Sequence, residues 1–279
     1  MTIHFYTPAS PLSQYIEALW YVDLQVPYAQ EKILPTGCIE LIINLGPPHM
    51  TFDQDGLSYK LMRDSWVAGF HTRYIINAPL AETRMFGVRF KPGGAAPFFD
   101  EPIHLFTNAI VDLDGIWGSD SYLLRERLLG SPSISQAFQL LDAYLLSRLF
   151  EKEQAPKSIV HAVDQLVSAQ GRRPIRGLSA EVGYSQKHLI KKFKDTVGVT
   201  PKQFNRVLKL QAVLKQIDSQ RPINWSTVAQ DAFYYDQSHF NRDFRSFAGL
   251  TPEDYVKQRL AFFESSELSA ENAHFVPLR

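Results

Sequence analysis

Two short segments of the sequence place polar and basic side chains at helical spacing. They are Gln186, Lys187, Lys191 and Lys194 in the first segment, and Gln237, Ser238, Asn241, Arg242 and Arg245 in the second. Amide, hydroxyl and guanidinium groups hydrogen-bond to base edges in the major groove of DNA, and ammonium groups neutralise phosphates. On a single helix the same pattern also fits a solvated surface. Taken one at a time, the segments fit either interpretation.

The two segments belong to an internal repeat. The residues His188-Leu189, Phe193, Gly198, Thr200-Pro201 and Phe204 recur 51 positions later as His239-Phe240, Phe244, Gly249, Thr251-Pro252 and Tyr255. A helix, a glycine stop and a Thr-Pro restart make up half of a helical unit, so the repeat predicts tandem units. Because the polar positions recur in phase, the duplication favours nucleic-acid binding over chance surface charge.

Each unit is predicted to contain a helix, a tight turn and a second helix. In the first unit, residues 178–182 form the first helix, Gly183 supplies a left-handed turn and Ser185 caps the second helix. In the second unit, Asp236 is the expected cap and Phe233 stands in place of the glycine. Aromatic residues rarely adopt left-handed backbone angles. The second turn is therefore either widened by one extra residue or mildly strained, and we expect the wider turn.

The second unit carries the most specific motif. Residues 234–244 (YYDQSHFNRDF) followed by 249–255 (GLTPEDY) resemble the signature of AraC/XylS-type bacterial transcription regulators. The resemblance covers residues 159–259 and implies two helix-turn-helix motifs joined by a long helix, which residues 206–217 would supply. Such a connector would place the two second helices about one turn of DNA apart, roughly 34 Å.

The resemblance also implies which side chains contact DNA. By family position the base-reading residues are Gln186, Lys187, Ile190, Lys191, Gln237, Ser238, Asn241 and Arg242, and Lys194, His239 and Arg245 complete the set expected to contact DNA. Ile190 departs from the usual polar choice, so it either touches a thymine methyl or rests near the backbone. His188 and His239 either pack beside the turn or donate to phosphate. Neither has a second metal ligand at suitable spacing in its helix, so we expect no metal and no cofactor.

Charge is divided unevenly along the chain. Residues 1–155 carry a net charge of −6 and residues 156–263 a net charge of +8, although the whole chain is formally neutral. A basic half is the electrostatic footprint of nucleic-acid binding. The expected organisation is an effector-binding and dimerisation domain at 1–150, a linker at 151–156, a DNA-binding domain at 157–263 and a frayed polar tail at 264–279.

The composition excludes other classes of protein. A single cysteine, Cys38, rules out a disulfide framework, and burial as an inert thiol is its expected fate. No apolar run approaches the ~20 residues of a membrane span, and no basic segment precedes an apolar one at the N-terminus. We therefore expect a cytoplasmic, nucleoid-associated protein without membrane contact.

The N-terminal half is predicted to consist mainly of short β-strands. Short β-rich runs at 39–45, 66–70, 74–77 and 84–90 are separated by turn residues, which predicts an antiparallel barrel or sandwich and an α+β protein overall. The family resemblance implies a cupin-like, effector-binding domain. The expected pocket aromatics are Trp20, Tyr21, Trp66, Phe70 and Tyr74. Core packing is the alternative for these side chains.

A helix ending near Phe150 carries an apolar stripe. The stripe consists of Ile134, Phe138, Leu141, Leu145 and Leu149. The spacing suits a partner helix, and we interpret it as a homodimer seam in preference to packing on the protein's own barrel.

The sequence therefore predicts a sequence-specific transcription regulator that responds to a small-molecule effector. Its expected partners are double-stranded DNA, the effector, RNA polymerase and a second copy of the chain. The alternatives are a constitutive or architectural DNA binder and a cupin-type enzyme fused to a DNA-binding domain. Catalysis is not expected, because His4, His49, His71 and His104 stand apart and one cysteine cannot form a zinc-bound nucleophile. Activation and repression both remain open.

Overall fold

The computed structural model describes residues 2–52, 56–79, 82–150, 155–219, 222–263 and 275–278. Its strands are β1 (Thr2–Tyr6), β2 (Ile16–Gln25), β3 (Gln30–Ile33), β4 (Glu40–Asn44), β5 (His49–Phe52), β6 (Tyr59–Met62), β7 (Ser65–Ala68), β8 (Ile75–Pro79), β9 (Glu82–Phe90), β10 (Ile110–Asp112) and β11 (Phe275–Leu278). Its α-helices are α1 (Asp114–Trp117), α2 (Ser119–Leu129), α3 (Ile134–Phe150), α4 (Lys157–Ser168), α5 (Leu178–Glu181), α6 (Gln186–Val197), α7 (Pro201–Ser219), α8 (Trp225–Asp231), α9 (Gln237–Ala248) and α10 (Pro252–Phe263). Short 3-10 turns, η1 (Leu12–Gln14), η2 (Ala96–Phe98) and η3 (Ile103–Phe106), lie between strands.

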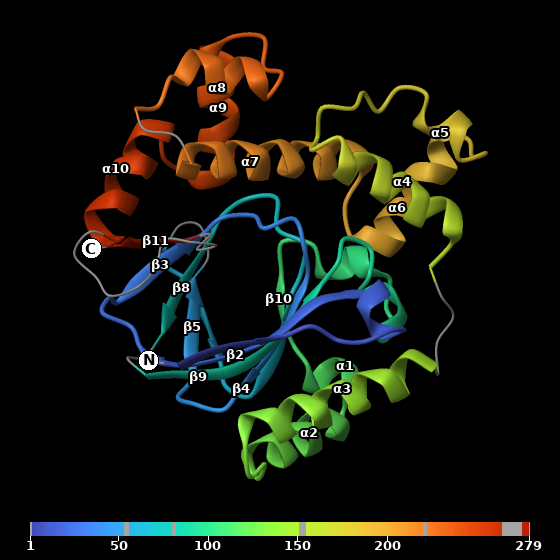
Figure 1. The fold of residues 1–279 in the computed structure, drawn as a ribbon, viewed down its shortest axis with the longest axis vertical. Coiled ribbons are helices and arrows are strands. Elements are labelled where there is room, and N and C mark those ends of the chain that lie inside the picture. Colours follow the sequence, from blue (N-terminus) through green and yellow to red (C-terminus); the bar gives the residue numbers. More distant parts are fainter. Residues whose placement is uncertain are drawn as a thin grey trace.

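The strands form two antiparallel sheets, ordered β1-β2-β9-β4-β7-β10 and β11-β3-β8-β5-β6. In Figure 1 the sheets occupy the middle of the molecule, with α1–α3 on one side and α4–α10 on the other. The predicted antiparallel N-terminal domain followed by a helical region is thus confirmed. Its likeness to cupin domains stays a prediction.

The larger sheet is covered on both faces, because successive side chains of a strand point to opposite sides. On β9, Phe86 and Val88 join the main core beneath the helices, whereas Met85 joins a smaller cluster that includes Trp66 and Ile42. The smaller cluster faces the second sheet. A space between the sheets therefore has walls formed by alternate residues of the central strands.

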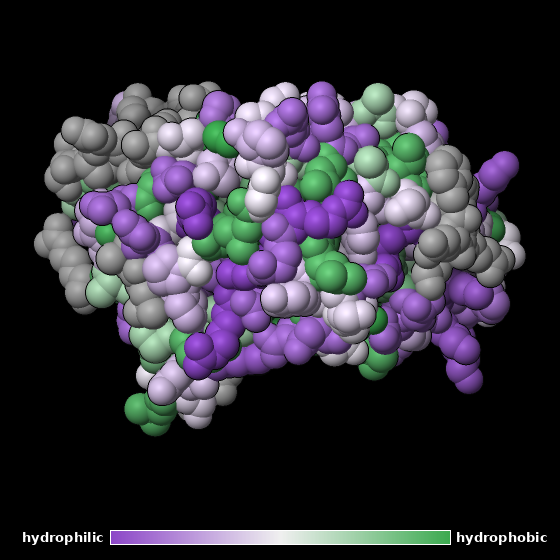
Figure 2. All heavy atoms as spheres, turned by 90° about the horizontal axis from the view of Figure 1, so that it is seen from below, coloured by the Kyte–Doolittle hydropathy of each residue, from purple (hydrophilic) through white to green (hydrophobic). Residues whose placement is uncertain are grey.

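Helix α3 packs on the larger sheet of its own chain. Leu141 and Leu145 are fully buried, and the ring of Phe138 lies 5.6 Å from that of Tyr6 and 5.3 Å from that of Phe86. This corrects the prediction of a dimer seam, since Phe138, Leu141, Leu145 and Leu149 are already covered within the chain. Figure 2, which views the molecule from this side, shows a mainly hydrophilic surface with scattered hydrophobic groups.

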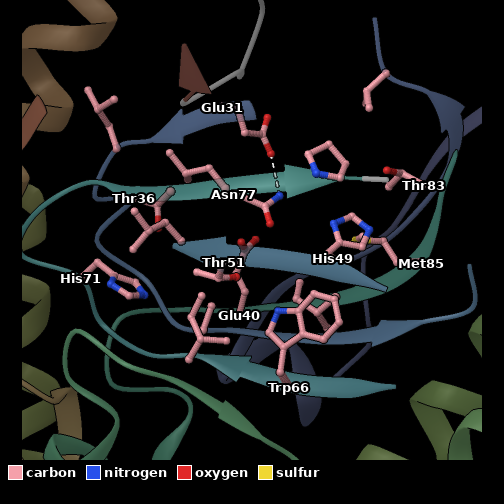
Figure 3. Close-up of a pocket in the computed structure, with 18 of the residues that line it drawn as sticks. Glu31, Thr36, Glu40, His49, Thr51, Trp66, His71, Asn77, Thr83 and Met85 are labelled. Carbon is pink, nitrogen blue, oxygen red and sulfur yellow. Dashed lines mark hydrogen bonds between the residues drawn. The ribbon is translucent and has the colours of Figure 1, made fainter. Parts of the chain in front are cut away.

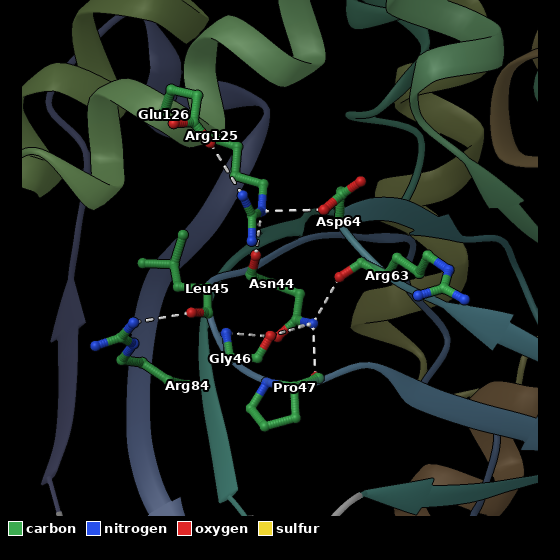
Figure 4. A network of polar contacts seen from close by, with 9 residues as sticks. All are labelled: Asn44, Leu45, Gly46, Pro47, Arg63, Asp64, Arg84, Arg125 and Glu126. Carbon is green, nitrogen blue, oxygen red and sulfur yellow. Dashed lines mark hydrogen bonds and ion pairs between the residues drawn. The ribbon is translucent and has the colours of Figure 1, made fainter.

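A buried polar network anchors α2 to the end of β4 (Figure 4). Asn44 is inaccessible to solvent, and its amide nitrogen donates to the carbonyl oxygens of Pro47 at 2.8 Å and Arg63 at 2.7 Å. The guanidinium of Arg125, on α2, donates to the carbonyl of Asn44 at 2.8 Å and pairs with Asp64 at 3.4 Å. One amide side chain thus joins two turns of the sheet beneath the helical layer.

Helix α7 is the central helix of the C-terminal region. Its apolar side chains Val207, Leu210, Val213, Leu214 and Ile217 are buried, in the stripe expected for a connector. In Figure 1, α5 and α6 lie near one end of α7, and α8 and α9 lie near the other. Among the described residues, no helix combines the length and the apolar character needed to cross a membrane.

The segment after α10 differs from the predicted frayed tail. Within 264–279 the structure describes residues 275–278, and these form β11, which pairs antiparallel with β3. The prediction was wrong for this strand because its partner lies in the other half of the sequence. Of the predicted linker 151–156, residues 151–154 lie outside the described part of the chain.

Candidate nucleic-acid interface and cavity

The first helix pair, α5 and α6, has the expected turn. Gly183 adopts a φ of +73°, and the Ser185 hydroxyl accepts from the backbone N–H of His188 at 3.3 Å. Leu189, Phe193 and Val197 are buried on the inner face of α6. The turn chemistry and the apolar face together fix which side of α6 is open to solvent.

The second pair, α8 and α9, repeats this geometry and corrects one prediction. Phe233 has a φ of +57°, so it occupies the left-handed position that Gly183 fills in the first pair. The hydrogen bond that follows the turn is the same: Tyr184 N donates to Ser179 O at 2.9 Å, and Tyr234 N donates to Ala229 O at 3.0 Å. The second pair therefore has both a left-handed turn residue and one extra residue. The extra residue is Tyr235, which is 93% exposed and lies just before the helix cap Asp236.

Polar contacts brace the second pair against α7. The Tyr234 hydroxyl donates to Asp243 Oδ2 at 2.9 Å, and Arg206, on α7, pairs with the same carboxylate. Burial and the neighbouring Asp243 raise the pKa of Tyr234, so its hydroxyl remains a donor at neutral pH. The Arg206 guanidinium also lies 4.9 Å above the ring of Phe247. These contacts fix the angle of α9 relative to the connector.

The two repeated histidines lie beside their turns. The His188 ring is 4.6 Å from that of Tyr184, and the His239 ring is 5.3 Å from that of Tyr234. Of the two roles left open by the sequence, packing is the one seen here. Among the described residues, no group of three potential metal ligands comes together.

The side chains expected to contact DNA differ in how far they are exposed to solvent. Gln186, Lys187, Ile190, Lys191, Ser238, His239, Arg242 and Arg245 are exposed, whereas Lys194, Gln237 and Asn241 are partly buried. The Asn241 carboxamide oxygen is inaccessible and has no hydrogen-bond partner. The open faces of α6 and α9 can therefore offer amide, hydroxyl and cationic donors to a ligand.

A cavity of about 260 Å³ separates the two sheets. Among its lining residues are Trp20, Glu31, Cys38, Glu40, His49, Thr51, Trp66, His71, Asn77, Thr83 and Met85. Trp20 and Trp66 are two of the aromatics expected there. Tyr21 and Phe70 instead belong to the main core, because each is adjacent to a cavity-facing residue and points the other way. Tyr74 contacts the helical region instead.

The polar groups of the cavity come from both sheets (Figure 3). Glu31 Oε1 accepts from Asn77 Nδ2 at 2.9 Å, and its Oε2 accepts from the Tyr28 hydroxyl at 2.7 Å. Burial raises the pKa of Glu31 and lowers those of His49 and His71 to about 4. Both histidines are therefore neutral at neutral pH. His49 Nε2 and both ring nitrogens of His71 have no hydrogen-bond partner.

Other titratable groups are already engaged. Glu40 Oε1 pairs with Arg89 Nε at 2.8 Å and lies 3.4 Å from Trp20 Nε1. Burial raises the pKa of the Cys38 thiol to about 12, which makes this cysteine a poor nucleophile. Glu31, His49 and Asn77 were not among the predicted site residues. Side chains alternate between the two faces of a strand, so a known strand register would have placed these three in the cavity.

The sequence matches two known domain families. Residues 178–258 match the family described as a helix-turn-helix domain, whose type is that of the AraC regulators. This segment is an AraC-type helix-turn-helix domain. Such domains place their second helix in the major groove, so DNA is the partner of this half of the protein. Residues 4–112 match a domain of unknown function, DUF6597. No curated protein matches the sequence.

Solved structures match over most of the chain at low identity. ToxT from Vibrio cholerae has a TM-score of 0.48 at 10% identity, covering 86% of this chain and 98% of its own. Wild-type ToxT bound to an unsaturated fatty acid has a TM-score of 0.47 at 11% identity, covering 85% and 93%. The AraC-like transcriptional activator CuxR has a TM-score of 0.29 at 11% identity, covering 75% and 85%.

The AraC-type domain touches the sheet domain through loop 69–75, which is the connection between β7 and β8 together with the first residue of β8. The Phe70 ring lies 5.8 Å from that of Phe204, at the start of α7, and Tyr74 N donates to Phe247 O on α9 at 2.7 Å. Gly69 and His71, in the same loop, line the cavity. This loop therefore borders both the cavity and the helical region.

Further contacts hold the first helix pair and the connector. His104 Nδ1 lies 3.1 Å from Asp195 Oδ1, and the Thr107 hydroxyl donates to the carbonyl of Gly198 at the end of α6. The Gln211 amide of α7 donates to the carbonyl of Pro35. Helices α6, α7 and α9 of the AraC-type domain thus each contact the sheet domain.

Proposed function

We propose that this protein is a sequence-specific transcription regulator whose DNA binding responds to a small molecule held between its two sheets. The observation that carries the proposal is the position of loop 69–75. His71 of this loop faces the cavity, while Phe70 contacts Phe204 near the start of α7 and Tyr74 contacts Phe247 of α9.

A ligand in the cavity would act through this loop. His71 lies in the same short loop as Phe70 and Tyr74, so an occupant that shifts the backbone at His71 would also shift Phe70 and Tyr74. Phe70 packs beside Gly198, which ends α6, and Tyr74 packs against Gly249, which ends α9. The ligand would thereby change how the two second helices sit relative to each other. Two helices must keep a fixed spacing to enter successive major grooves together.

The two second helices would divide the work of binding DNA. Lys187, Lys191 and Lys194 of α6 supply cations for phosphate oxygens, with Gln186 and Ile190 beside them. Gln237, Ser238, Asn241 and Arg242 of α9 supply the amide, hydroxyl and guanidinium donors that distinguish base pairs. His239 and Arg245 lie at the margin of that face. In this proposal the DNA-binding domain is 157–263, and β11 belongs to the effector domain.

The first experiment is selection of binding sites from random DNA duplexes with the full-length protein, followed by affinity measurements at several salt concentrations. Arg242→Ala is expected to relax the preference at one position, with a loss of about fivefold to a hundredfold on the best site. Lys194→Ala should weaken all sites alike and reduce the salt slope by about 1. Arg127→Ala, an exposed cation on α2, is the charge-matched control and should change neither.

The outcome also separates the proposal from its alternatives. An architectural binder would select no sequence over random DNA, whereas a specific regulator is expected to prefer its site by about a thousandfold or more. If no sequence is enriched, or if Arg242→Ala leaves the preference intact, the proposed role of α9 is wrong.

A further inference from the structure

The cavity has an unusual balance of charge. Its lining contains two carboxyl groups, Glu31 and Glu40, and none of the described lining residues is a lysine or an arginine. Glu40 is already paired with Arg89, which lies outside the lining. Glu31 has no cation among its hydrogen-bond partners, which are the Tyr28 hydroxyl and the Asn77 amide. Within the described part of the chain, one acidic group thus faces the cavity without an opposite charge.

Burial makes this arrangement of Glu31 energetically costly. Glu31 is only 8% exposed, and a buried carboxylate without a counter-ion favours its neutral form. Two neutral donors hold the carboxyl group in place, yet each carboxylate oxygen can accept a second hydrogen bond. A positively charged donor that enters the cavity would supply the missing partner.

The walls of the cavity also suit a cation attached to an apolar body. Trp20 and Trp66 present indole rings, whose faces attract cations. Polar groups lie apart from Glu31: His49 Nε2 and the Thr83 hydroxyl are buried, line the cavity and have no partner. In Figure 3, Glu31 extends into the space from the strand drawn above it, and His49 and Thr83 are seen farther to the right. His49 is uncharged, so it would not repel a cation.

We propose that the cavity binds an organic ammonium compound with an aromatic or compact aliphatic body, and that Glu31 receives its ammonium group. The identity of this cavity as the effector site rests on the function proposed above. A cavity of about 260 Å³ lined mainly by apolar side chains suits a compact ligand, such as a single ring with a short amine chain. A carboxylate ligand would face Glu31 without any cation to receive it.

The test compares three ligands of similar shape by titration calorimetry on the full-length protein. Phenethylamine carries the cation, phenethyl alcohol replaces it by a hydroxyl, and hydrocinnamate replaces it by a carboxylate. Because a hydrogen bond between charged groups is stronger than a neutral one, the amine is expected to bind about tenfold to a hundredfold tighter than the alcohol. Hydrocinnamate should bind more weakly than the alcohol.

The variant Glu31→Gln removes the charge and keeps the shape of the side chain. It is expected to abolish the preference for the amine, while Glu82→Gln, an exposed carboxyl on β9, leaves it unchanged. If Glu31→Gln does not fold, Glu31→Asp should weaken amine binding and keep the preference. Failure of the amine to bind, equal binding of amine and alcohol, or a preference that survives Glu31→Gln would overturn the proposal.

Parallel measurement of DNA binding keeps the two proposals separate. An amine that binds through Glu31 without changing DNA affinity would support the ligand class and refute the ligand response. A different compound that changes DNA affinity while the amine fails to bind would support regulation and refute the ligand class.

Discussion

The contact between Gly249 and Tyr74 gives a direct measure of how the AraC-type domain is joined to the sheet domain. A methyl group added at Gly249 would lie 2.5 Å from Tyr74 Cε1 and 3.0 Å from its Cζ. The φ of Gly249 is +65°, which is unfavourable for any other residue. Gly249→Ala thus introduces two separate costs, a strained backbone and a steric clash between domains.

The magnitudes of the two costs can be separated. An alanine in a left-handed position loses about 1 kcal/mol, and overpacking a closed contact costs about 1–3 kcal/mol more. Gly183→Ala is the matched control, since Gly183 has a φ of +73° and no atom within 4 Å of the added methyl. We expect Gly183→Ala to lower the free energy of unfolding by about 1 kcal/mol and Gly249→Ala by about 2–4 kcal/mol.

A double-mutant cycle isolates the clash. In a Tyr74→Ala background the ring is absent, so Gly249→Ala should cost only the backbone term. The expected coupling between the two substitutions is about 1–3 kcal/mol. Urea denaturation followed by tryptophan fluorescence and by circular dichroism gives the free energies, provided the two transitions coincide. Additive effects, within about 0.5 kcal/mol, would refute the contact and with it the link from loop 69–75 to the second helix pair.

Three further predictions concern stability. Leu145→Ala should lower the free energy of unfolding by about 2–5 kcal/mol without changing the oligomeric state by light scattering, whereas the half-exposed Leu123→Ala should cost below about 1 kcal/mol; an altered oligomeric state would restore the dimer seam. Asn44→Ala should cost about 2–4 kcal/mol in urea denaturation, because several buried groups lose their partner; a neutral result would contradict the network. The pKa of His49 is about 4 in the folded state against 6.5 for the free side chain, so the unfolded state binds the extra proton. Stability should therefore fall as pH drops from about 6.5 to 4, by roughly 3 kcal/mol for His49, and thermal denaturation of His49→Gln should show a shallower decline; an equal decline would argue against a buried neutral imidazole.

The C-terminal half could be predicted in detail because its signals are local. Caps such as Ser185 and Asp236, stops such as Gly198, and apolar positions at helical spacing each act within one or two turns. The conformation of Phe233 could not, since the residue that follows it, Tyr234, is held by Asp243 of α9 and lies beneath Lys209 of α7. Local propensity there yields to tertiary context.

For the N-terminal half, the sequence allowed only the fold class to be predicted. Alternation identifies strands, but strand register decides that Trp20 faces the cavity and Tyr21 the core. Nothing in the sequence distinguishes the buried Glu31 from a surface carboxylate, because its burial depends on a sheet edge completed by β11. The stripe on α3 likewise shows that an apolar partner exists, without showing whether it lies in the same chain.

The pairing of β11 with β3 changes how the protein can be divided. The chain leaves the sheet domain before α4 and returns to it at β11, after α10, so the AraC-type domain is attached by its two ends. A protease cut between α3 and α4 would leave two fragments held together by the strand ladder, and they would elute as one species. A C-terminal fragment expressed alone would expose Phe275–Leu278 as an unpaired edge, which invites aggregation. An affinity tag fused after this strand would sit on the sheet that carries Glu31.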